Sequence, residues 1–126
     1  MIPKYRAWLP TLQWMCEVTA IDYDLRSLDI CRIGDVERYT EMRVDKDEVV
    51  LMRSTGLKDK NGVEIFEGAI LKDDWESGKV VYDPDRTMWR VYGKDFDDAL
   101  SDWWMGRVVG NIYENPELME ADNDPK

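Results

Sequence analysis

The chain has 126 residues, the length of one ordinary domain, and its 44% hydrophobic content is that of a globular protein with a real core. It carries 27 acidic and 17 basic residues, a net charge of −10, which repels a phosphate backbone, so direct nucleic-acid binding is not expected. Histidine is absent, which removes the commonest general base and the commonest metal ligand. The two cysteines, Cys16 and Cys31, lack metal-ligand spacing and are predicted to be buried free thiols.

Neither a secretion signal nor a membrane span is predicted. Residues 1–15 contain Pro3, Lys4, Arg6 and Pro10, which interrupt the apolar stretch that a signal peptide requires. No run approaches the roughly 18–20 apolar residues that cross a bilayer. We therefore expect a cytoplasmic protein with no membrane association.

The first part of the chain is predicted to consist of strands. Residues 2–9 alternate with a rough period of two, and residues 14–23 alternate more clearly, with one apolar face. Residues 28–33 alternate again after a polar turn and are predicted to pair antiparallel with that strand. Residues 36–42 fit either a strand or one or two helical turns, and residues 48–53 are rich in strand-forming residues.

The densest set of backbone signals lies in residues 54–71. Asn61 and Gly62 separate two runs of strand-forming residues, and this dipeptide is the strongest short-range signal for a two-residue hairpin. A type I′ turn needs φ > 0 at both positions, which Asn and Gly tolerate, so this turn is predicted here. Gly56 and Gly68 flank the hairpin and are predicted to lie at a bulge or a tight bend.

A second hairpin and a helix are predicted further along the chain. Residues 79–83 and 87–92 flank a segment with the composition of a turn. Residues 95–105 then break the strand pattern, and their apolar side chains recur at helical spacing, which predicts a short α-helix with Asp95 as its N-cap. The apolar stripe consists of Phe96, Ala99, Leu100, Trp103 and Trp104.

The C-terminal part is predicted to hold a last strand at residues 107–113 and a final helical turn at residues 116–119. Asn115 followed by Pro116 is typical of a helix start. Residues 121–126 are polar and are predicted to be a disordered tail. Because the chain shows no internal repeat and no long linker, residues 1–120 are predicted to form a single domain.

Two separated segments are similar to the hallmark motifs of the YopX family. The first is Ser-Thr-Gly-Leu-Lys-Asp-Lys-Asn-Gly at residues 54–62, continued by Glu-Ile-Phe-Glu-Gly and Ile70. The second is Val-Gly-Asn-Ile-Tyr-Glu-Asn-Pro-Glu-Leu at residues 109–118. Residues 4–8 and 18–22 also resemble the family, so the likeness spans nearly the whole domain, although Ala69 replaces the usual Asp.

The resemblance implies a protein of phage or prophage origin with a mainly β fold. It further implies a small Src-homology-3-like barrel built from antiparallel hairpins, with one or two short helices near the C-terminus. N-terminal strands, residues 1–53, would precede the barrel portion, residues 54–120. The resemblance implies no activity and supplies no catalytic residue.

Carboxylates are the only abundant groups with catalytic potential. A carboxylate-dependent hydrolase or a Mg²⁺ site is conceivable in principle, but these acids lie in expected loops and at the expected helix start, where solvation and capping explain them. They are Asp73, Asp74, Asp83, Asp85, Asp97, Asp98 and Asp102. The chain has no GxSxG motif, no P-loop and no dinucleotide fingerprint. We therefore expect no enzymatic activity, no metal and no cofactor.

Three tryptophans are candidates for a protein interface, where this residue is enriched. Trp104 is expected to pack with Leu100 in the core while Trp103 borders it; the alternative is that one of the two is an exposed aromatic anchor. Trp75 lies alone in the acidic loop 72–78 and is a further candidate anchor.

The leading hypothesis is a non-enzymatic phage accessory protein that binds a host or phage protein through aromatic and acidic surface. Self-association is a second expectation, because the strand 48–53 has an edge that a neighbouring subunit could extend. The main rival is an acidic DNA mimic that inhibits a host nucleic-acid-binding enzyme, which requires carboxylates at phosphate-like spacing. An enzyme is the third class and requires a pocket where acids with perturbed pKa values converge.

Overall fold

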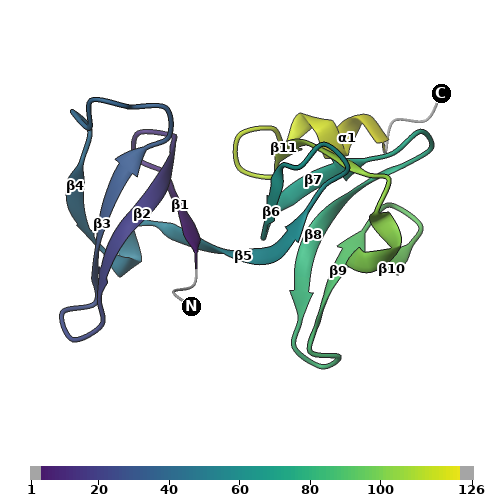
Figure 1. Ribbon diagram of the computed structural model, residues 1–126, viewed down its shortest axis with the longest axis horizontal. Helices are drawn as coiled ribbons and strands as arrows, with labels where there is room; N and C mark the ends of the chain where they lie inside the picture. Colours follow the sequence, from purple (N-terminus) through teal and green to yellow (C-terminus); the bar gives the residue numbers. More distant parts are fainter. Residues whose placement is uncertain (1–3, 123–126) are drawn as a thin grey trace. The chain divides into compact units, whose positions relative to one another are not determined.

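The computed structural model describes residues 4–122, and within that range the fold is mainly β, as the sequence predicts (Figure 1). Each strand pairing is antiparallel. The elements in chain order are β1 (Tyr5–Leu9), β2 (Trp14–Asp22), β3 (Ser27–Arg32), β4 (Met42–Asp45), the 3₁₀ helix η1 (Lys46–Glu48), β5 (Val50–Lys58), β6 (Glu64–Phe66), β7 (Ala69–Lys72), β8 (Ser77–Asp83), β9 (Met88–Tyr92), β10 (Asp97–Ala99), the 3₁₀ helix η2 (Leu100–Trp103), β11 (Arg107–Asn111) and the α-helix α1 (Glu117–Asp122).

The chain divides into two compact units, residues 1–53 and residues 54–126. Strand β5 runs from the first unit into the second, so that its first half pairs with β1 and its second half pairs with β6. The boundary coincides with the division between N-terminal strands and barrel portion drawn from the sequence. That the two units constitute one domain stays a prediction.

The first unit is one antiparallel sheet in the order β4-β3-β2-β1-β5. Ala7 pairs with Cys16 of β2 on one side and with Leu51 of β5 on the other. Because successive strand residues point to opposite faces, Ala7 and Leu9 are buried while Arg6 and Trp8 are half-buried. The core of this unit consists of small and aliphatic side chains: Ala7, Leu9, Cys16, Leu28, Ile30 and Val44.

Both cysteines are buried free thiols, as predicted. The Sγ atom of Cys31 lies 3.6 Å from the hydroxyl oxygen of Thr40. Burial raises the pKa of Cys16, the charge of Cys31 raises it further, and the opposing effect of Arg32 is smaller. The thiols therefore act as small core side chains.

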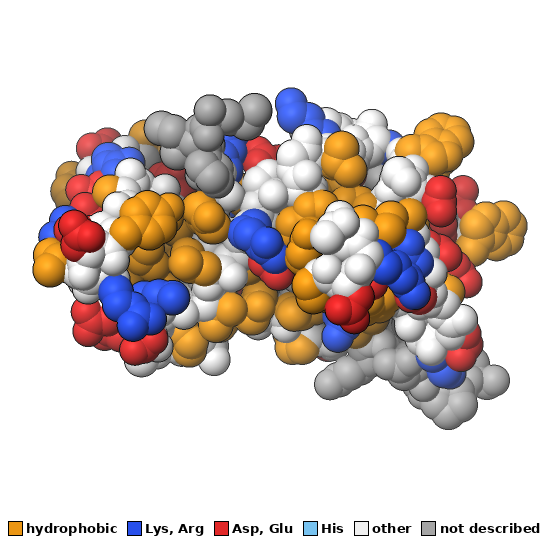
Figure 2. Space-filling view, turned by 90° about the horizontal axis from the view of Figure 1, so that it is seen from below, with side chains coloured by type: hydrophobic (Ala, Val, Ile, Leu, Met, Phe, Trp, Pro, Cys, Tyr) orange, Lys and Arg blue, Asp and Glu red, His pale blue; other side chains and the backbone are white. Residues whose placement is uncertain are grey.

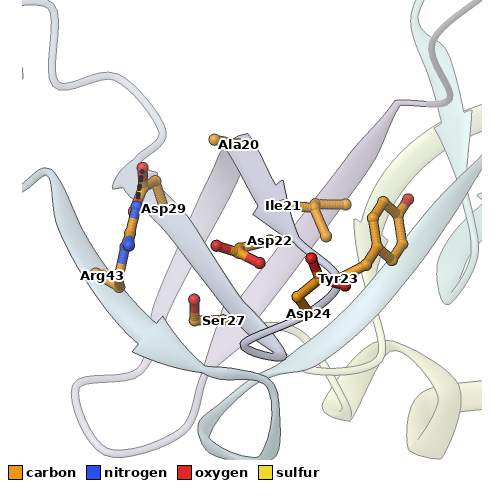
Figure 3. A pocket seen from close by; sticks show the side chains of 8 residues that line it. All are labelled: Ala20, Ile21, Asp22, Tyr23, Asp24, Ser27, Asp29 and Arg43. Carbon is orange, nitrogen blue, oxygen red and sulfur yellow. Dashed lines mark hydrogen bonds and ion pairs between the residues drawn. The ribbon is translucent and has the colours of Figure 1, made fainter.

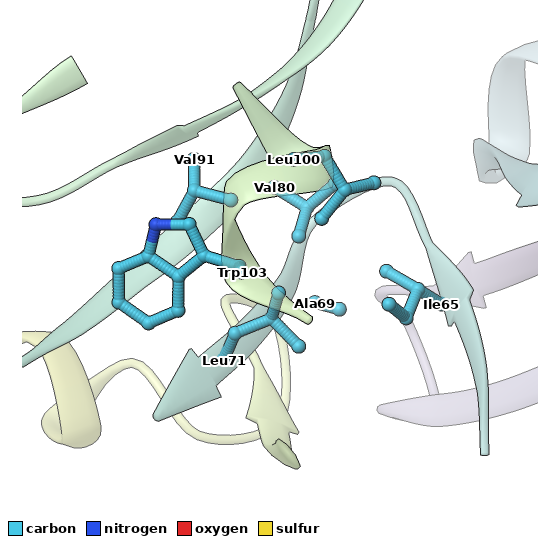
Figure 4. Packing of buried hydrophobic residues seen from close by; sticks show 7 residues of the cluster. All are labelled: Ile65, Ala69, Leu71, Val80, Val91, Leu100 and Trp103. Carbon is cyan, nitrogen blue, oxygen red and sulfur yellow. The ribbon is translucent and has the colours of Figure 1, made fainter. Parts of the chain in front are cut away.

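The second unit contains the hairpin of β5 and β6 and a five-stranded sheet in the order β10-β9-β8-β7-β11. The predicted hairpin of residues 79–92 is present as β8 and β9. Figure 4 shows the core, to which β6, β7, β8, β9 and η2 each contribute. Its members are Ile65, Ala69, Leu71, Val80, Val91, Leu100 and Trp103.

A Src-homology-3-like barrel is not confirmed. Among residues 4–122 the strands form open sheets, and β10 and β11 are the two edges of the five-stranded sheet.

The prediction of an α-helix over residues 95–105 is wrong. This segment forms the short strand β10, paired with β9, and then the single 3₁₀ turn η2. The N–H of Gly93 donates to the carbonyl oxygen of Phe96 (3.0 Å), which turns the chain back alongside β9. The Asp97 carboxylate then binds Arg90 (2.8 Å) and Arg86 (3.0 Å). These tertiary bonds override the helical spacing of the apolar residues.

The predicted type I′ turn at Asn61-Gly62 is also wrong, although the hairpin is present. Asn61 is not among the described residues with positive φ, whereas Gly62 has φ +84°. The N–H of Gly62 bonds the carbonyl oxygen of Asp59 (3.0 Å), and the N–H of Asp59 bonds that of Val63 (2.8 Å). The loop therefore has three residues, a β-turn followed by a left-handed glycine.

The C-terminal helix α1 follows Pro116 and includes residues 117–119 of the helical turn predicted at residues 116–119. It continues to Asp122, so the first two residues of the predicted disordered tail are helical. The rest of that tail, residues 123–126, lies outside the described residues.

Candidate functional site

The first family-like motif is organised by Asp59, a buried carboxylate with 8% of its surface exposed. Its Oδ1 accepts hydrogen bonds from the N–H groups of Asn61 (2.9 Å) and Val63 (2.8 Å), and its Oδ2 accepts one from Val108 of β11 (2.8 Å). Burial acts to raise the pKa of Asp59, but the three hydrogen bonds and the charge of Lys60 outweigh it and lower the pKa. Asp59 therefore ties the hairpin to the sheet.

The second family-like motif meets the first at Gly68, which has φ +84°. The N–H of Ile112 bonds the carbonyl oxygen of Gly68 (2.9 Å). At Gly110 a side chain is excluded, because a Cβ there would lie 2.4 Å from Oδ1 of Asn115. That oxygen accepts the N–H of Asn111 (3.2 Å), which shapes the turn before α1. Both motifs thus serve the architecture of the second unit.

Gly56 also has positive φ, +78°, and the pairing of β5 with β6 shifts register between Ser54 and Lys58. The chain is therefore bulged at this glycine.

Several of the carboxylates singled out from the sequence hold turns or pair with arginine. Oδ1 of Asp73 accepts the N–H groups of Trp75 (2.8 Å) and Glu76 (2.7 Å), and Asp83 caps the next turn through the N–H of Asp85 (2.9 Å). Asp97 binds Arg86 and Arg90, and its pKa is lowered chiefly by the hydrogen bond from Arg90. Within residues 4–122, no group of three or more Cys, Asp or Glu side chains could hold a metal ion.

Trp75 is 89% exposed although its backbone is held in place. It lies in the turn between β7 and β8, where Asp73 accepts the Trp75 N–H and the N–H of Asp73 bonds the carbonyl oxygen of Glu76 (3.0 Å). A large aromatic side chain thus projects into solvent from an ordered turn with acidic neighbours. This geometry fits the anchor role considered for Trp75.

The expected arrangement of Trp103 and Trp104 is reversed. Trp103 is buried with Leu100, its ring stacks on Phe96 with centroids 5.5 Å apart, and its Nε1–H donates to Asp98 (3.1 Å). Trp104 is 74% exposed. Because side chains in a 3₁₀ turn are separated by about 120°, burying Trp103 directs the next side chain away from the core. Trp103 is therefore removed from the candidate interface, and Trp104 remains in it.

The strand register brings Trp75 and Trp104 to the same end of the five-stranded sheet. Lys72 of β7 pairs with Ser77 of β8 and with Arg107 of β11. Trp75 follows Lys72 by three residues, and Trp104 precedes Arg107 by three residues. We call these two residues and the half-exposed Met105, which follows Trp104 in the chain, the tryptophan surface: Trp75, Trp104 and Met105.

Acidic side chains accompany this surface. The turn of Trp75 also contains Asp73, Asp74 and Glu76, and Asp102 lies two residues before Trp104. Figure 2 shows hydrophobic side chains standing out from the protein beside clusters of acidic ones.

A separate cavity of about 500 Å³ lies in the first unit, where β2 and β3 meet their connecting turn (Figure 3). Its wall includes an ion pair, in which Nε of Arg43 donates to Oδ1 of Asp29 (2.9 Å). The lining residues are Ala20, Ile21, Asp22, Tyr23, Asp24, Ser27, Asp29 and Arg43. Sequence reasoning missed this cavity, since residues 22–27 looked like an ordinary polar turn.

These features define a mainly β protein whose second unit is held by two motifs, with exposed tryptophans in that unit and a polar cavity in the first unit. The family model described as YopX protein matches residues 4–120. The chain therefore belongs to the YopX family, as the resemblance of its motifs implies.

A crystal structure of protein EF1440 from Enterococcus faecalis is similar to this chain over most of its length. The two are 34% identical with a TM-score of 0.63, and the match covers 94% of this chain and 99% of the other. Curated proteins give no significant match. In the described part of the chain, no helix has the length and apolar character needed to cross a membrane.

Proposed function

We propose that this protein is a non-enzymatic protein-binding module whose partner docks on the tryptophan surface. The observation that carries the proposal is the pair of exposed rings, Trp75 and Trp104, at one end of a sheet. Exposed tryptophan is costly in water, and it is among the residues that dominate binding energy at protein interfaces.

The positions of these rings favour binding because the backbone that carries them is already ordered in the free protein. Hydrogen bonds to Asp73 fix the backbone of Trp75, and the burial of Trp103 fixes the chain beside Trp104. Binding to such a surface costs less conformational entropy than binding to a mobile loop. The flanking carboxylates Asp73, Asp74 and Glu76 favour a partner segment with Lys or Arg side chains, which also interact with ring faces.

The experiment is affinity capture with matched baits. Wild-type protein, the double variant Trp75→Ala/Trp104→Ala and the control Leu25→Ala, an exposed residue of the other unit, are compared in host lysate. We expect one partner that is retained by wild type and control and lost with the double variant, whose folding is checked by circular dichroism. A partner captured equally by all three baits would contradict the proposed surface.

Self-association, phage or prophage origin and a cytoplasmic location are parts of the same proposal. An open sheet edge supports self-association, and light scattering at high micromolar concentration tests it, a strict monomer counting against it. The family resemblance supports a phage role.

We also propose a Src-homology-3-like barrel for residues 54–120. The support is that this unit is built from short antiparallel strands with a 3₁₀ turn before the last strand.

The DNA-mimic alternative rests on the net charge of −10. Several carboxylates are already engaged within the protein, since Asp59 and Asp73 hold backbone N–H groups and Asp97 and Asp29 bind arginines. This reduces the charge available to imitate a phosphate row, so we rank the mimic second. Competition between the protein and duplex DNA for a captured partner would favour it.

A further inference from the structure

The cavity of the first unit contains a buried polar group without a partner. Ser27 is 6% exposed, and its Oγ is buried with no hydrogen bond from the described residues. A buried hydroxyl that lacks a partner destabilises a protein, so such groups are rare in the absence of a ligand or water. In Figure 3 the Ser27 hydroxyl points into the cavity, toward the side chain of Asp22.

Asp22 and Ser27 are direct cross-strand partners of β2 and β3, so their side chains leave the sheet on the same face. The Oδ1 atom of Asp22 accepts the N–H of Leu25 (3.0 Å), which fixes the carboxylate and leaves Oδ2 for the cavity. Asp24, in the turn between the strands, adds a second carboxylate to the lining.

The remaining charges of the cavity cancel each other. Arg43 donates to both oxygens of Asp29, from Nε (2.9 Å) and from the second guanidinium nitrogen (3.3 Å). Arg43 also interacts electrostatically with Asp22, but the lining has three carboxylates, Asp22, Asp24 and Asp29, against this one guanidinium, so the cavity is anionic.

We propose that this cavity binds an organic ammonium group. An ammonium has three N–H donors and no acceptor, and the cavity offers three acceptors: the carboxylates of Asp22 and Asp24 and the Ser27 hydroxyl oxygen. The cavity combines carboxylates with a hydroxyl oxygen, a set of acceptors that suits a cation with several N–H donors. The ammonium comes from a small alkylamine or from a lysine of a partner chain.

The test is an NMR titration of the full chain with three probes: butylammonium, blocked lysine and tetramethylammonium. Tetramethylammonium carries the same charge but no N–H donor. We expect the first two to shift the amide signals of residues 20–29 and 43, with tetramethylammonium weaker by about tenfold or more. Tighter binding of blocked lysine than of butylammonium assigns the site to a partner protein, and equal binding assigns it to a free amine. Equal binding of all three probes, or no shifts in these residues, overturns the proposal.

Three variants separate this site from general surface charge. Ser27→Ala is expected to weaken the binding of butylammonium by about fivefold, which corresponds to the loss of one hydrogen bond. It is not expected to lower the melting temperature of the protein, because it removes an unpaired polar group. Asp22→Asn, which keeps the Oδ1 acceptor for Leu25, weakens it by about tenfold. Asp85→Asn makes the same charge change at an exposed turn of the other unit and has no effect. An equal loss in Asp22→Asn and Asp85→Asn overturns the proposal.

Discussion

Asp59 accepts a 2.8 Å hydrogen bond from the backbone N–H of Val108, 49 residues further along the chain. The same carboxylate accepts two N–H groups of its own hairpin loop, from Asn61 and Val63. One buried side chain thus joins the first family-like segment to β11, at the residue just before the second segment begins. The hydrogen bonds of both motifs thus hold the second unit together.

Replacing Asp59 with asparagine is expected to destabilise the second unit. Asparagine keeps one acceptor oxygen for the loop N–H groups but presents an NH₂ group to the N–H of Val108, so this donor loses its partner. An unsatisfied buried donor costs about 1–3 kcal/mol, and we expect a loss of this size in urea or thermal unfolding. The control Asp85→Asn, at an exposed turn, should change the stability by less than about 0.5 kcal/mol. Equal stability of the two variants would contradict the role of Asp59.

Lowering the pH should remove the contribution of the Asp59 carboxylate to stability. Because its folded-state pKa is lowered, Asp59 contributes stability that is present above its unfolded pKa of about 3.9 and is lost as the pH falls through the folded pKa. The stability difference between wild type and Asp59→Asn should therefore be largest near neutral pH and should shrink below about pH 4. Urea unfolding at a series of pH values measures it. A difference that stays constant down to pH 2 would show that Asp59 does not titrate as described.

The conformation of the hairpin loop predicts that substitutions at two neighbouring positions reduce the stability by different amounts. Gly62 has φ +84°, a conformation that strains any L side chain, whereas Asn61 has no positive φ. We expect Gly62→Ala to destabilise by about 1 kcal/mol or more, and Asn61→Ala by less than about 0.5 kcal/mol. Thermal unfolding of the two variants decides the matter. Comparable losses at both positions would favour the type I′ turn that the Asn-Gly dipeptide suggested.

Most of the strands could be predicted because half-buried strands leave a period of two in the sequence, as in residues 14–23. The segment 95–105 could not, because its helical spacing competes with bonds to Arg86 and Arg90, which lie outside the segment. The loop at Asn61 was misread for a related reason. The dipeptide indicates a turn, but the Asp59 side chain selects which turn forms.

The candidate sites also differ in how far the sequence could predict them. The position of Trp75 alone in an acidic loop made it a candidate anchor, but only the structure shows that its side chain is exposed. The choice between Trp103 and Trp104 depended on the phase of a 3₁₀ turn, which the sequence does not encode locally. The cavity at Ser27 depended on the register of β2 and β3, which places Asp22 opposite it.

The two neighbouring tryptophans should respond very differently to truncation. Trp103 is buried, stacked on Phe96 and bonded to Asp98, so Trp103→Ala should cost about 3–5 kcal/mol. Trp104→Ala and Trp75→Ala remove solvated side chains and should change the stability by less than about 0.5 kcal/mol. Chemical unfolding measures all three. A large loss for Trp104→Ala would place that ring in the core and remove it from the tryptophan surface.

The two thiols provide a test of the first unit. Cys16 and Cys31 are buried and free, and burial raises the pKa of Cys16, so little of the reactive thiolate forms near neutral pH. A disulfide reagent at pH 8 should therefore modify neither thiol in the native protein at an appreciable rate, and should modify two per chain in urea.

Because the folded pKa of Cys16 is raised, the stability from its neutral form is complete below the unfolded pKa of about 8.5 and is lost as the pH rises through the folded pKa. The first unit should accordingly lose stability, and its thiols should react faster, as the solution becomes strongly alkaline. Rapid modification of one thiol in the native protein at pH 8 would contradict the buried positions of both residues.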